Sequence, residues 1–314
     1  MYNNSILILV VYFMYIVDTH CDSLLTVNAE RGLINAHNIS AKYPQLQLFA
    51  EFVPKDGMPP EYRRKRIFGL LDAYISECQR LGIQPVRDCQ ELNFAVENGV
   101  RASILAIEGG GGLMPDSPEI DTLYRMGLRV MSLCWDTNEL ASSAWDREDT
   151  GLSEEGRRMV DVLGAYGIII DVSHLSDRSF YDVMERTAYP VIATHSNFRD
   201  VCASPRNLTL DMARRITARG GIIGLNIYPA FLSDSGRADA SDIYRHVDYC
   251  LDKLGEDVLC FGCDIDGVEA YPDGFDNDSS IHDRLVDILL ERYSESVVEK
   301  IAGLNAINFF KGNL

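Results

Sequence analysis

The stretch that decides the fold is GIIIDVSHLSDRSFYDVMERTAYPVIATHS, residues 167–196. Two short apolar runs, at 167–174 and 190–196, enclose a segment at 176–187 with the spacing of an amphipathic helix. The apolar runs are continuous and do not alternate with polar residues, which is typical of strands covered on both faces of a sheet. A strand, a helix and a second strand in this order predict a parallel β/α/β unit.

The same alternation repeats along the chain. Six more apolar runs have the character of buried strands, at 15–20, 46–54, 101–109, 129–135, 221–229 and 258–266. Further helical patterns lie at 61–82, 153–167, 209–221, 241–255, 281–293 and 294–310. Eight strands interleaved with helices predict one α/β domain over residues 14–314, a single (β/α)8 TIM-type barrel with extra C-terminal helices. A doubly wound open sheet is the alternative, but no G-x-G-x-x-G follows the first run to favour it.

The composition excludes several classes of protein. The 314 residues are 46% hydrophobic and 24% charged, which is ordinary for a globular protein and excludes a disordered or fibrous chain. The 29 Lys and Arg residues against 47 Asp and Glu residues give a net charge of −18, so we expect neither nucleic acid nor a membrane surface as a partner. Eight cysteines in a chain of this size are expected to be reduced, and we interpret Cys260 and Cys263 as core residues.

The N-terminal segment contains an apolar run at residues 5–17, similar to the core of a signal peptide. No Lys or Arg precedes the run, no small-residue cleavage site follows it, and it is too short to span a bilayer comfortably. It leads directly into the first predicted strand, and Met14 is a natural start for a cytosolic chain. We therefore interpret residues 1–13 as an upstream extension of the kind that a misassigned start codon produces, and we expect a cytoplasmic protein.

Residues with metal-binding side chains follow the apolar runs. In a barrel of this type the active site lies at the C-terminal ends of the strands. His20 and Asp22 end the first run, and their i, i+2 spacing points both side chains to the same side of an extended chain. Later runs end in further candidates: Glu108, His174, His195, and Asp264 with Asp266 beside it.

Three of the six histidines are thus predicted to lie at one end of the barrel together with carboxylates. Two His-plus-carboxylate groups that share Glu108 would satisfy two metal ions with nitrogen and oxygen ligands, which suits zinc. No cysteine belongs to this set, so a structural zinc site is not expected. The remaining histidines fall in loop or helical stretches, and we expect them at the surface: His37, His246 and His282.

Five motifs resemble, in order, those of the membrane (renal) dipeptidase family of zinc metallopeptidases, which have amidohydrolase-type barrels. They are VDTHCD (17–22), AIEGG (106–110), DVSHLSD (171–177), THSNFRDVCASPRN (194–207) and GCDIDGV (262–268). The resemblance implies two zinc ions per chain, bridged by Glu108 and a water or hydroxide. It implies that His20 and Asp22 bind one ion, and that His174 and His195 bind the other. It also implies substrate-binding roles for Arg206, which would hold the substrate carboxylate, for Asp264, which would transfer a proton near the substrate amine, and for Tyr228, which would line the pocket.

The activity that the resemblance implies is hydrolysis of dipeptides, L-L and also L-D, by a metal-activated hydroxide, and a homodimer would be ordinary for the family. One alternative is a barrel metallohydrolase for another small amide, a lactone or an N-acyl amino acid. A second alternative is a catalytically silent metal-binding scaffold. The full set of five ligands argues against the scaffold, which has no need for converging ligands.

One departure from the family concerns the end of the fourth run. Where the mammalian-type enzymes have a histidine thought to hold the substrate carbonyl, this chain reads Ser132-Leu133-Cys134-Trp135. Trp135 can donate one N–H but cannot become a cation. We expect Trp135 to stand at the rim of the pocket, to narrow it, and to favour apolar substrate side chains.

Overall fold

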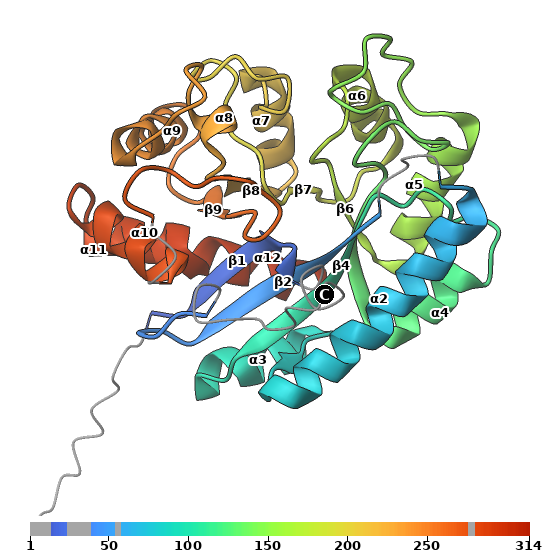
Figure 1. The fold of residues 1–314 in the computed structure, drawn as a ribbon, viewed down its shortest axis with the longest axis horizontal. Helices are drawn as coiled ribbons and strands as arrows, with labels where there is room; N and C mark the ends of the chain where they lie inside the picture. The colour runs from blue at the N-terminus through green and yellow to red at the C-terminus, as the bar shows by residue number, and fades with distance from the viewer. Residues whose placement is uncertain (1–13, 24–38, 54–57, 276–279) are drawn as a thin grey trace, which may run out of the picture.

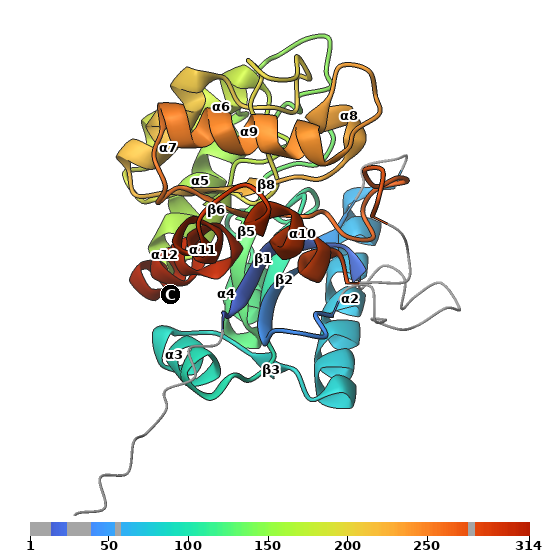
Figure 2. The same cartoon turned by 90° about the vertical axis from the view of Figure 1, so that its left-hand side faces the viewer.

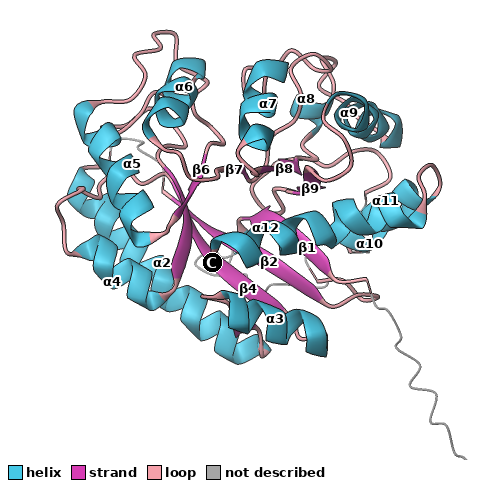
Figure 3. Cartoon of the chain, turned by 180° about the vertical axis from the view of Figure 1, so that it is seen from behind, coloured by secondary structure: helices cyan, strands magenta, loops and turns pink. Residues whose placement is uncertain are grey.

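The computed structural model describes residues 14–23, 39–53, 58–275 and 280–314; the predicted extension at 1–13 lies outside this part. Figures 1 and 3 show strands at the centre of the molecule and helices around them. The strands are β1 (Ile16–Cys21), β2 (Gln45–Phe52), β3 (Gln84–Pro85), β4 (Ala102–Glu108), β5 (Leu128–Ser132), β6 (Ile169–Asp171), β7 (Ile192–Ala193), β8 (Ile222–Leu225) and β9 (Leu259–Phe261).

The strands form a closed parallel barrel. Their order is β2-β1-β9-β8-β7-β6-β5-β4-β3, and β2 pairs again with β4, so eight strands complete the ring and the short β3 lies beside it. In the pairing of β2 with β4, which closes the ring, Leu46 lies opposite Ala102 at one end and Phe52 lies opposite Glu108 at the other. The predicted (β/α)8 TIM-type barrel is confirmed, and the open-sheet alternative is wrong because β2 pairs with β4 and closes the ring.

The helices surround this barrel. They are α2 (Pro60–Leu81), α3 (Cys89–Asn98), α4 (Glu119–Met126), α5 (Glu154–Tyr166), α6 (Asp177–Arg186), α7 (Leu210–Ala218), α8 (Pro229–Leu232), α9 (Ala240–Lys253), α10 (Ile281–Leu290), α11 (Glu295–Glu299), the π-helical η1 (Lys300–Leu304) and α12 (Asn305–Asn313). Hydroxyl groups begin three of the predicted helices, because Ser153, Ser176 and Thr209 each accept a backbone N–H in the first turn of α5, α6 and α7.

The C-terminal helices close the structure on its first strand. Figure 2 shows α10, α11 and α12 beside β1, with α9 on one side and α3 on the other. The Tyr244 hydroxyl of α9 donates to the Ile288 carbonyl of α10, and α12 contacts both α3 and β1. The predicted closing helices are therefore present, and the stretch predicted as one helix at 294–310 is divided among α11, η1 and α12.

Burial agrees with the sequence pattern in most of the core. Cys260 and Cys263 are fully buried, as predicted, and all eight cysteines, which lie in the described ranges, are free thiols. Across the described ranges, we find no helix that combines the length and apolar character needed to span a membrane.

Candidate metal centre

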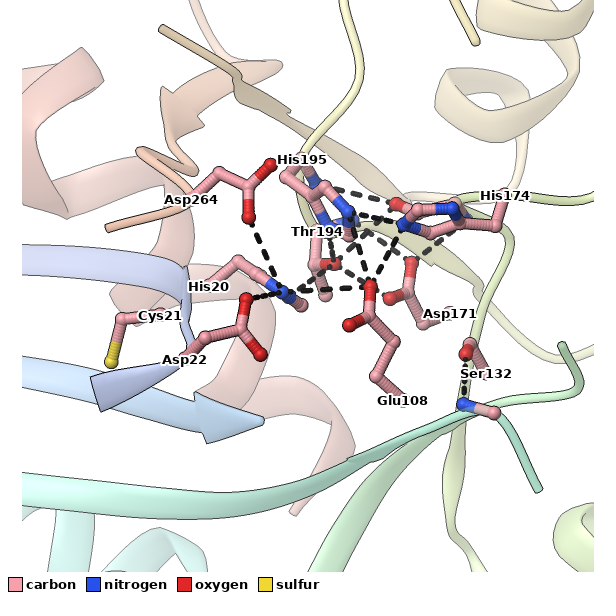
Figure 4. A network of polar contacts seen from close by, with 12 residues as sticks. His20, Cys21, Asp22, Glu108, Ser132, Asp171, His174, Thr194, His195 and Asp264 are labelled. Atoms are coloured by element: carbon pink, nitrogen blue, oxygen red, sulfur yellow. Dashed lines mark hydrogen bonds and ion pairs between the residues drawn. The ribbon is translucent and has the colours of Figure 1, made fainter. Parts of the chain in front are cut away.

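The five predicted ligands lie together at the C-terminal end of the barrel (Figure 4). His20 lies on β1 and Asp22 directly follows it, while Glu108 is the last residue of β4. His174 and His195 lie in the loops that follow β6 and β7. All five side chains are buried. Parallel strands present their carboxyl ends at one edge, so residues far apart in the chain become neighbours there.

One oxygen of Glu108 faces three histidine rings. Glu108 Oε1 lies 2.8 Å from His174 Nε2, 3.3 Å from His195 Nε2 and 3.6 Å from His20 Nε2. Ligand atoms of His20, Asp22 and Glu108 lie within 4.8 Å of one another, and so do those of Glu108, His174 and His195. The two groups share Glu108, an arrangement that suits two neighbouring ions.

The donor set fits a metal ion. His20 Nε2, Asp22 Oδ1 and Glu108 Oε1 are among the buried atoms that have no hydrogen-bond partner within the described structure. Leaving such an atom unpaired costs roughly 1–3 kcal/mol, which a cation bound between them would offset. Nitrogen and oxygen donors without a thiolate suit zinc and similar divalent ions.

Burial and the neighbouring charges also shift the pKa values of the residues in this site. Burial raises the pKa of Glu108 well above its usual range, although His20 opposes this. Burial by itself would lower the pKa of His20, but the carboxylates of Glu108, Asp22 and Asp264 outweigh it and raise that pKa to about 10. Burial lowers the pKa of His174 and His195, so both rings are neutral at pH 7 and able to act as ligands.

Asp264 lies beside the ligands in the loop after β9. Its Oδ1 is 3.8 Å from His20 Nε2, and its Oδ2 accepts a hydrogen bond of 2.9 Å from Asn226 Nδ2. Burial raises the pKa of Asp264 to about 6. Sequence reasoning missed Asn226, although a polar residue inside the apolar run at 221–229 was a usable signal.

Arg206 is buried in the loop between β7 and α7. Its Nη2 donates to the His195 carbonyl at 3.3 Å, its guanidinium lies 5.4 Å from the centre of the Phe231 ring, and Nε has no hydrogen-bond partner within the described residues. Burial lowers the pKa of Arg206, and Asp264 and Glu108 oppose that shift. A buried guanidinium with an unused donor is suited to binding a carboxylate.

A cavity of about 330 Å³ opens over four residues of the site, Asp22, Glu108, His174 and Asp264. Trp135 and Tyr228 both line it, as do Trp145 and Phe231. The Trp135 ring packs edge-on against Phe52 at 4.6 Å and lies 6.1 Å from the His174 ring. The Tyr228 hydroxyl donates to Glu269 Oε2 at 2.9 Å, so the aromatic wall of the cavity meets an acidic rim.

The backbone is strained at the same place. Among the described residues, the non-glycine positions with positive φ are His174 (67°), Asp264 (60°) and Asp266 (66°). Such conformations cost about 1–3 kcal/mol each and persist where the surroundings enforce them, often at functional sites. Asp266 also lines the cavity, so this geometry brings it into the site beside Asp264.

The expected surface position is wrong for two histidines, and His37 lies outside the described residues. His246 and His282 are both fully buried, because each lies on the inward face of its helix, α9 or α10. His282 Nε2 is 2.7 Å from Asp18 Oδ2, and Asp18 Oδ1 accepts the backbone N–H groups of His20 and Cys263. Asp18, which sequence reasoning did not single out, thus joins β1 to the loop that carries Asp264.

Comparison with known proteins identifies the family. The family model described as membrane dipeptidase (Peptidase family M19) matches residues 9–312. The chain belongs to this family. Membership supports metal-dependent hydrolysis of dipeptides.

Curated relatives agree with this assignment. The chain is 31% identical over 226 residues, 68% of its length, to an uncharacterised protein in the pqqA 5′ region of Klebsiella pneumoniae, of which 83% is covered. It is 30% identical over 219 residues, again 68% of its length, to the dipeptidase tcpJ of Claviceps purpurea. The match covers 51% of that dipeptidase and 56% of an uncharacterised dipeptidase of Schizosaccharomyces pombe, so this chain spans about half the length of these dipeptidases.

Solved structures show the same fold. A metallo peptidase from Rhodobacter sphaeroides, liganded with a phosphinate mimic of L-Ala-D-Ala, superposes with a TM-score of 0.86 at 23% identity, covering 96% of this chain and 100% of that one. The dipeptidase AC, a metallo peptidase, superposes with a TM-score of 0.85 at 24% identity, covering 96% and 99%.

Proposed function

We propose that this protein hydrolyses dipeptides, both L-L and L-D, with two zinc ions held by the five clustered side chains. The observation that carries the proposal is the convergence of three histidine Nε2 atoms on Glu108 Oε1, with Asp22 beside His20. In this proposal His20 and Asp22 hold one ion, His174 and His195 hold the other, and Glu108 binds both. When bound, such a pair of ions polarises the scissile carbonyl and lowers the pKa of a water molecule.

Arg206 supplies recognition of the substrate's free carboxylate. Its guanidinium is fixed near the ligands by the His195 carbonyl and by Phe231, and it can bind a carboxylate through paired N–H groups. The buried guanidinium would select substrates with a free carboxylate at this position, because a peptide extended at its C-terminus would place an uncharged amide there. Recognition of this kind favours dipeptides over peptides with further C-terminal residues.

In this proposal, Oδ1 of Asp264 is the atom that accepts and releases the proton. Asn226 holds Oδ2 by a hydrogen bond, which leaves Oδ1 on the side of His20 and the ligand cluster. A carboxylate held in this way can accept a proton from the attacking water and give it to the leaving amine. Its short side chain and fixed backbone limit where that proton can go.

The aromatic wall bears on the choice of substrate. Trp135 and Tyr228 line the cavity together with Phe52, Trp145 and Phe231. In this proposal Trp135 narrows the pocket and favours an apolar side chain on the substrate.

The test combines metal analysis with a substrate panel. Purified wild type should bind two zinc ions per chain and hydrolyse L-L and L-D dipeptides faster than N-acyl amino acids. Glu108→Gln should lose metal from both sites and lose activity, whereas Glu97→Gln, at an exposed position of α3, should change neither. Full metal content and full activity in Glu108→Gln would refute the two-ion assignment, and a preference for N-acyl amino acids would refute the substrate class.

A further inference from the structure

We propose that Thr194 and Asp171 are positioning residues that hold a proton on Nδ1 of both His20 and His195, and thereby direct Nε2 of both rings toward the metal ions. The inference rests on the proposed function, because it takes both histidines as metal ligands. Thr194 precedes His195 in the loop after β7, and Asp171 is the last residue of β6. Both side chains are buried (Figure 4).

The Thr194 hydroxyl has a single proton to donate. Thr194 Oγ1 lies 2.6 Å from Asp171 Oδ2, 2.8 Å from His195 Nδ1 and 3.3 Å from His20 Nδ1. A carboxylate can only accept, and the contact with Asp171 is the shortest of the three, so the hydroxyl donates its proton there. The lone pairs of Oγ1 then remain for the two rings, and each ring must donate N–H from Nδ1.

Asp171 is itself fixed as an acceptor. Its Oδ1 accepts the backbone N–H groups of Ser173 at 2.9 Å and of Thr194 at 3.0 Å. Ser173 Oγ, at 3.4 Å from Thr194 Oγ1, is the most distant polar neighbour of that hydroxyl. With three N–H or O–H donors directed at it, Asp171 sets the direction in which the Thr194 proton points.

The barrel also fixes the backbone of Thr194. Its carbonyl accepts a hydrogen bond of 2.6 Å from Thr19 Oγ1. A Cβ atom added to Gly224 or Gly262 would lie only 1.9 or 2.0 Å from the same carbonyl oxygen, so only glycine permits this close approach from β8 and from the loop after β9. The hydroxyl therefore has little freedom to leave the two rings.

The Thr194 hydroxyl consequently contacts one proposed ligand of each ion, His20 and His195. The His20 and His195 rings lie with their centroids 3.7 Å apart, and the Nε2 atoms of both face Glu108 Oε1. A neutral histidine with its proton on Nδ1 keeps the lone pair of Nε2 free for a metal, whereas the other tautomer blocks it. Removing the hydroxyl should weaken both sites together.

The first experiment measures zinc affinity by competition with a chelator. Thr194→Val removes the hydroxyl and should weaken zinc binding about 10–100-fold, as loss of a group that orients metal ligands typically does. Thr194→Ser restores the hydroxyl and should bind zinc as the wild type does. Thr187→Val is the matched control, because Thr187 is also buried and its hydroxyl accepts the Tyr189 backbone N–H at 3.1 Å, away from both histidine rings. Wild-type affinity in Thr194→Val, or an equal loss in Thr187→Val, would overturn the proposal.

The second experiment requires no variant and decides the matter if Thr194→Val does not fold. Long-range ¹H–¹⁵N NMR of the metal-free wild type at neutral pH should show His195 as a neutral ring with its proton on Nδ1. A proton on Nε2 would overturn the proposal. Absence of zinc binding by the wild type would instead refute the proposed function, so the two failures are distinguishable.

Discussion

Acidification should destabilise this protein through His246, and His246→Gln should remove that part of the effect. The ring is fully buried in α9, where Nδ1 accepts the Phe198 N–H at 3.4 Å and Nε2 lies 3.1 Å from the Leu232 carbonyl. A neutral ring with its proton on Nε2 satisfies both partners. A second proton, bound at Nδ1, would point at the Phe198 N–H. The two hydrogen-bond partners, Phe198 and Leu232, offer no carboxylate to balance the positive charge of the ring.

The size of the effect follows from the pKa of His246, which burial lowers from 6.5 to about 4. The unfolded chain takes up this proton as the pH falls through 6.5, whereas the folded chain takes it up only near pH 4. The stability contributed by this group is therefore complete above pH 6.5 and is lost as the pH falls toward 4. A difference of about 2.5 pH units corresponds to about 3 kcal/mol in the free energy of unfolding.

Urea unfolding followed by circular dichroism, from pH 7.5 down to pH 4, would measure this change. Other buried groups titrate in wild type and His246→Gln alike, so the difference between the two proteins isolates the histidine. Wild type should be the more stable at pH 7, and its advantage should shrink by up to about 3 kcal/mol by pH 4. A difference in stability that does not change with pH would refute the reasoning.

Three further changes test the substrate site. Asp264→Asn keeps the shape of the side chain and tolerates the left-handed backbone, but it removes the proton acceptor. The kcat of this variant should therefore fall about 10²–10⁴-fold with zinc content retained, and the kcat of Asp266→Asn should fall far less. Zinc loss that accounts for the whole effect would make Asp264 a ligand. Arg206→Met should lower kcat/KM for dipeptides roughly 10–100-fold, from the loss of a charged hydrogen bond, but should leave dipeptide amides unaffected; an equal loss for the amides would refute carboxylate recognition. Trp135→His should raise activity toward polar dipeptides without changing zinc content, and unchanged kcat/KM for every substrate would make Trp135 a packing residue.

The barrel could be predicted because its parallel strands are buried on both faces and are therefore apolar throughout. The same signal exaggerates strand length, since the run at 221–229 continues past β8 into Asn226 and Ile227, where burial persists but strand pairing has ended. The short helices α3, α4 and α8 were not predicted. With four residues, α8 makes about one turn and shows no periodicity, whereas α3 and α4 are about as long as α6 and α7, which were predicted.

The gathering of the five candidate ligands could be predicted because strand ends determine where side chains meet. The surface position expected for His246 was wrong although a signal existed, since Ile243, Val247 and Cys250 place the same face of α9 in the core. The roles of Thr194 and Asp171 had no such signal. They depend on which rotamers let three side chains meet at one hydroxyl, and residue spacing does not encode this.

The strained backbone at His174, Asp264 and Asp266 has a consequence for protein engineering. Each left-handed side chain costs about 1–3 kcal/mol that glycine would recover, so glycine at any of these positions relieves strain while it removes a side chain from the cavity. A library screened for heat resistance alone would therefore enrich glycine at these positions. Under the proposed function, stability and activity are opposed at His174 and Asp264, and a thermostable variant that keeps its function must gain its stability elsewhere in the barrel.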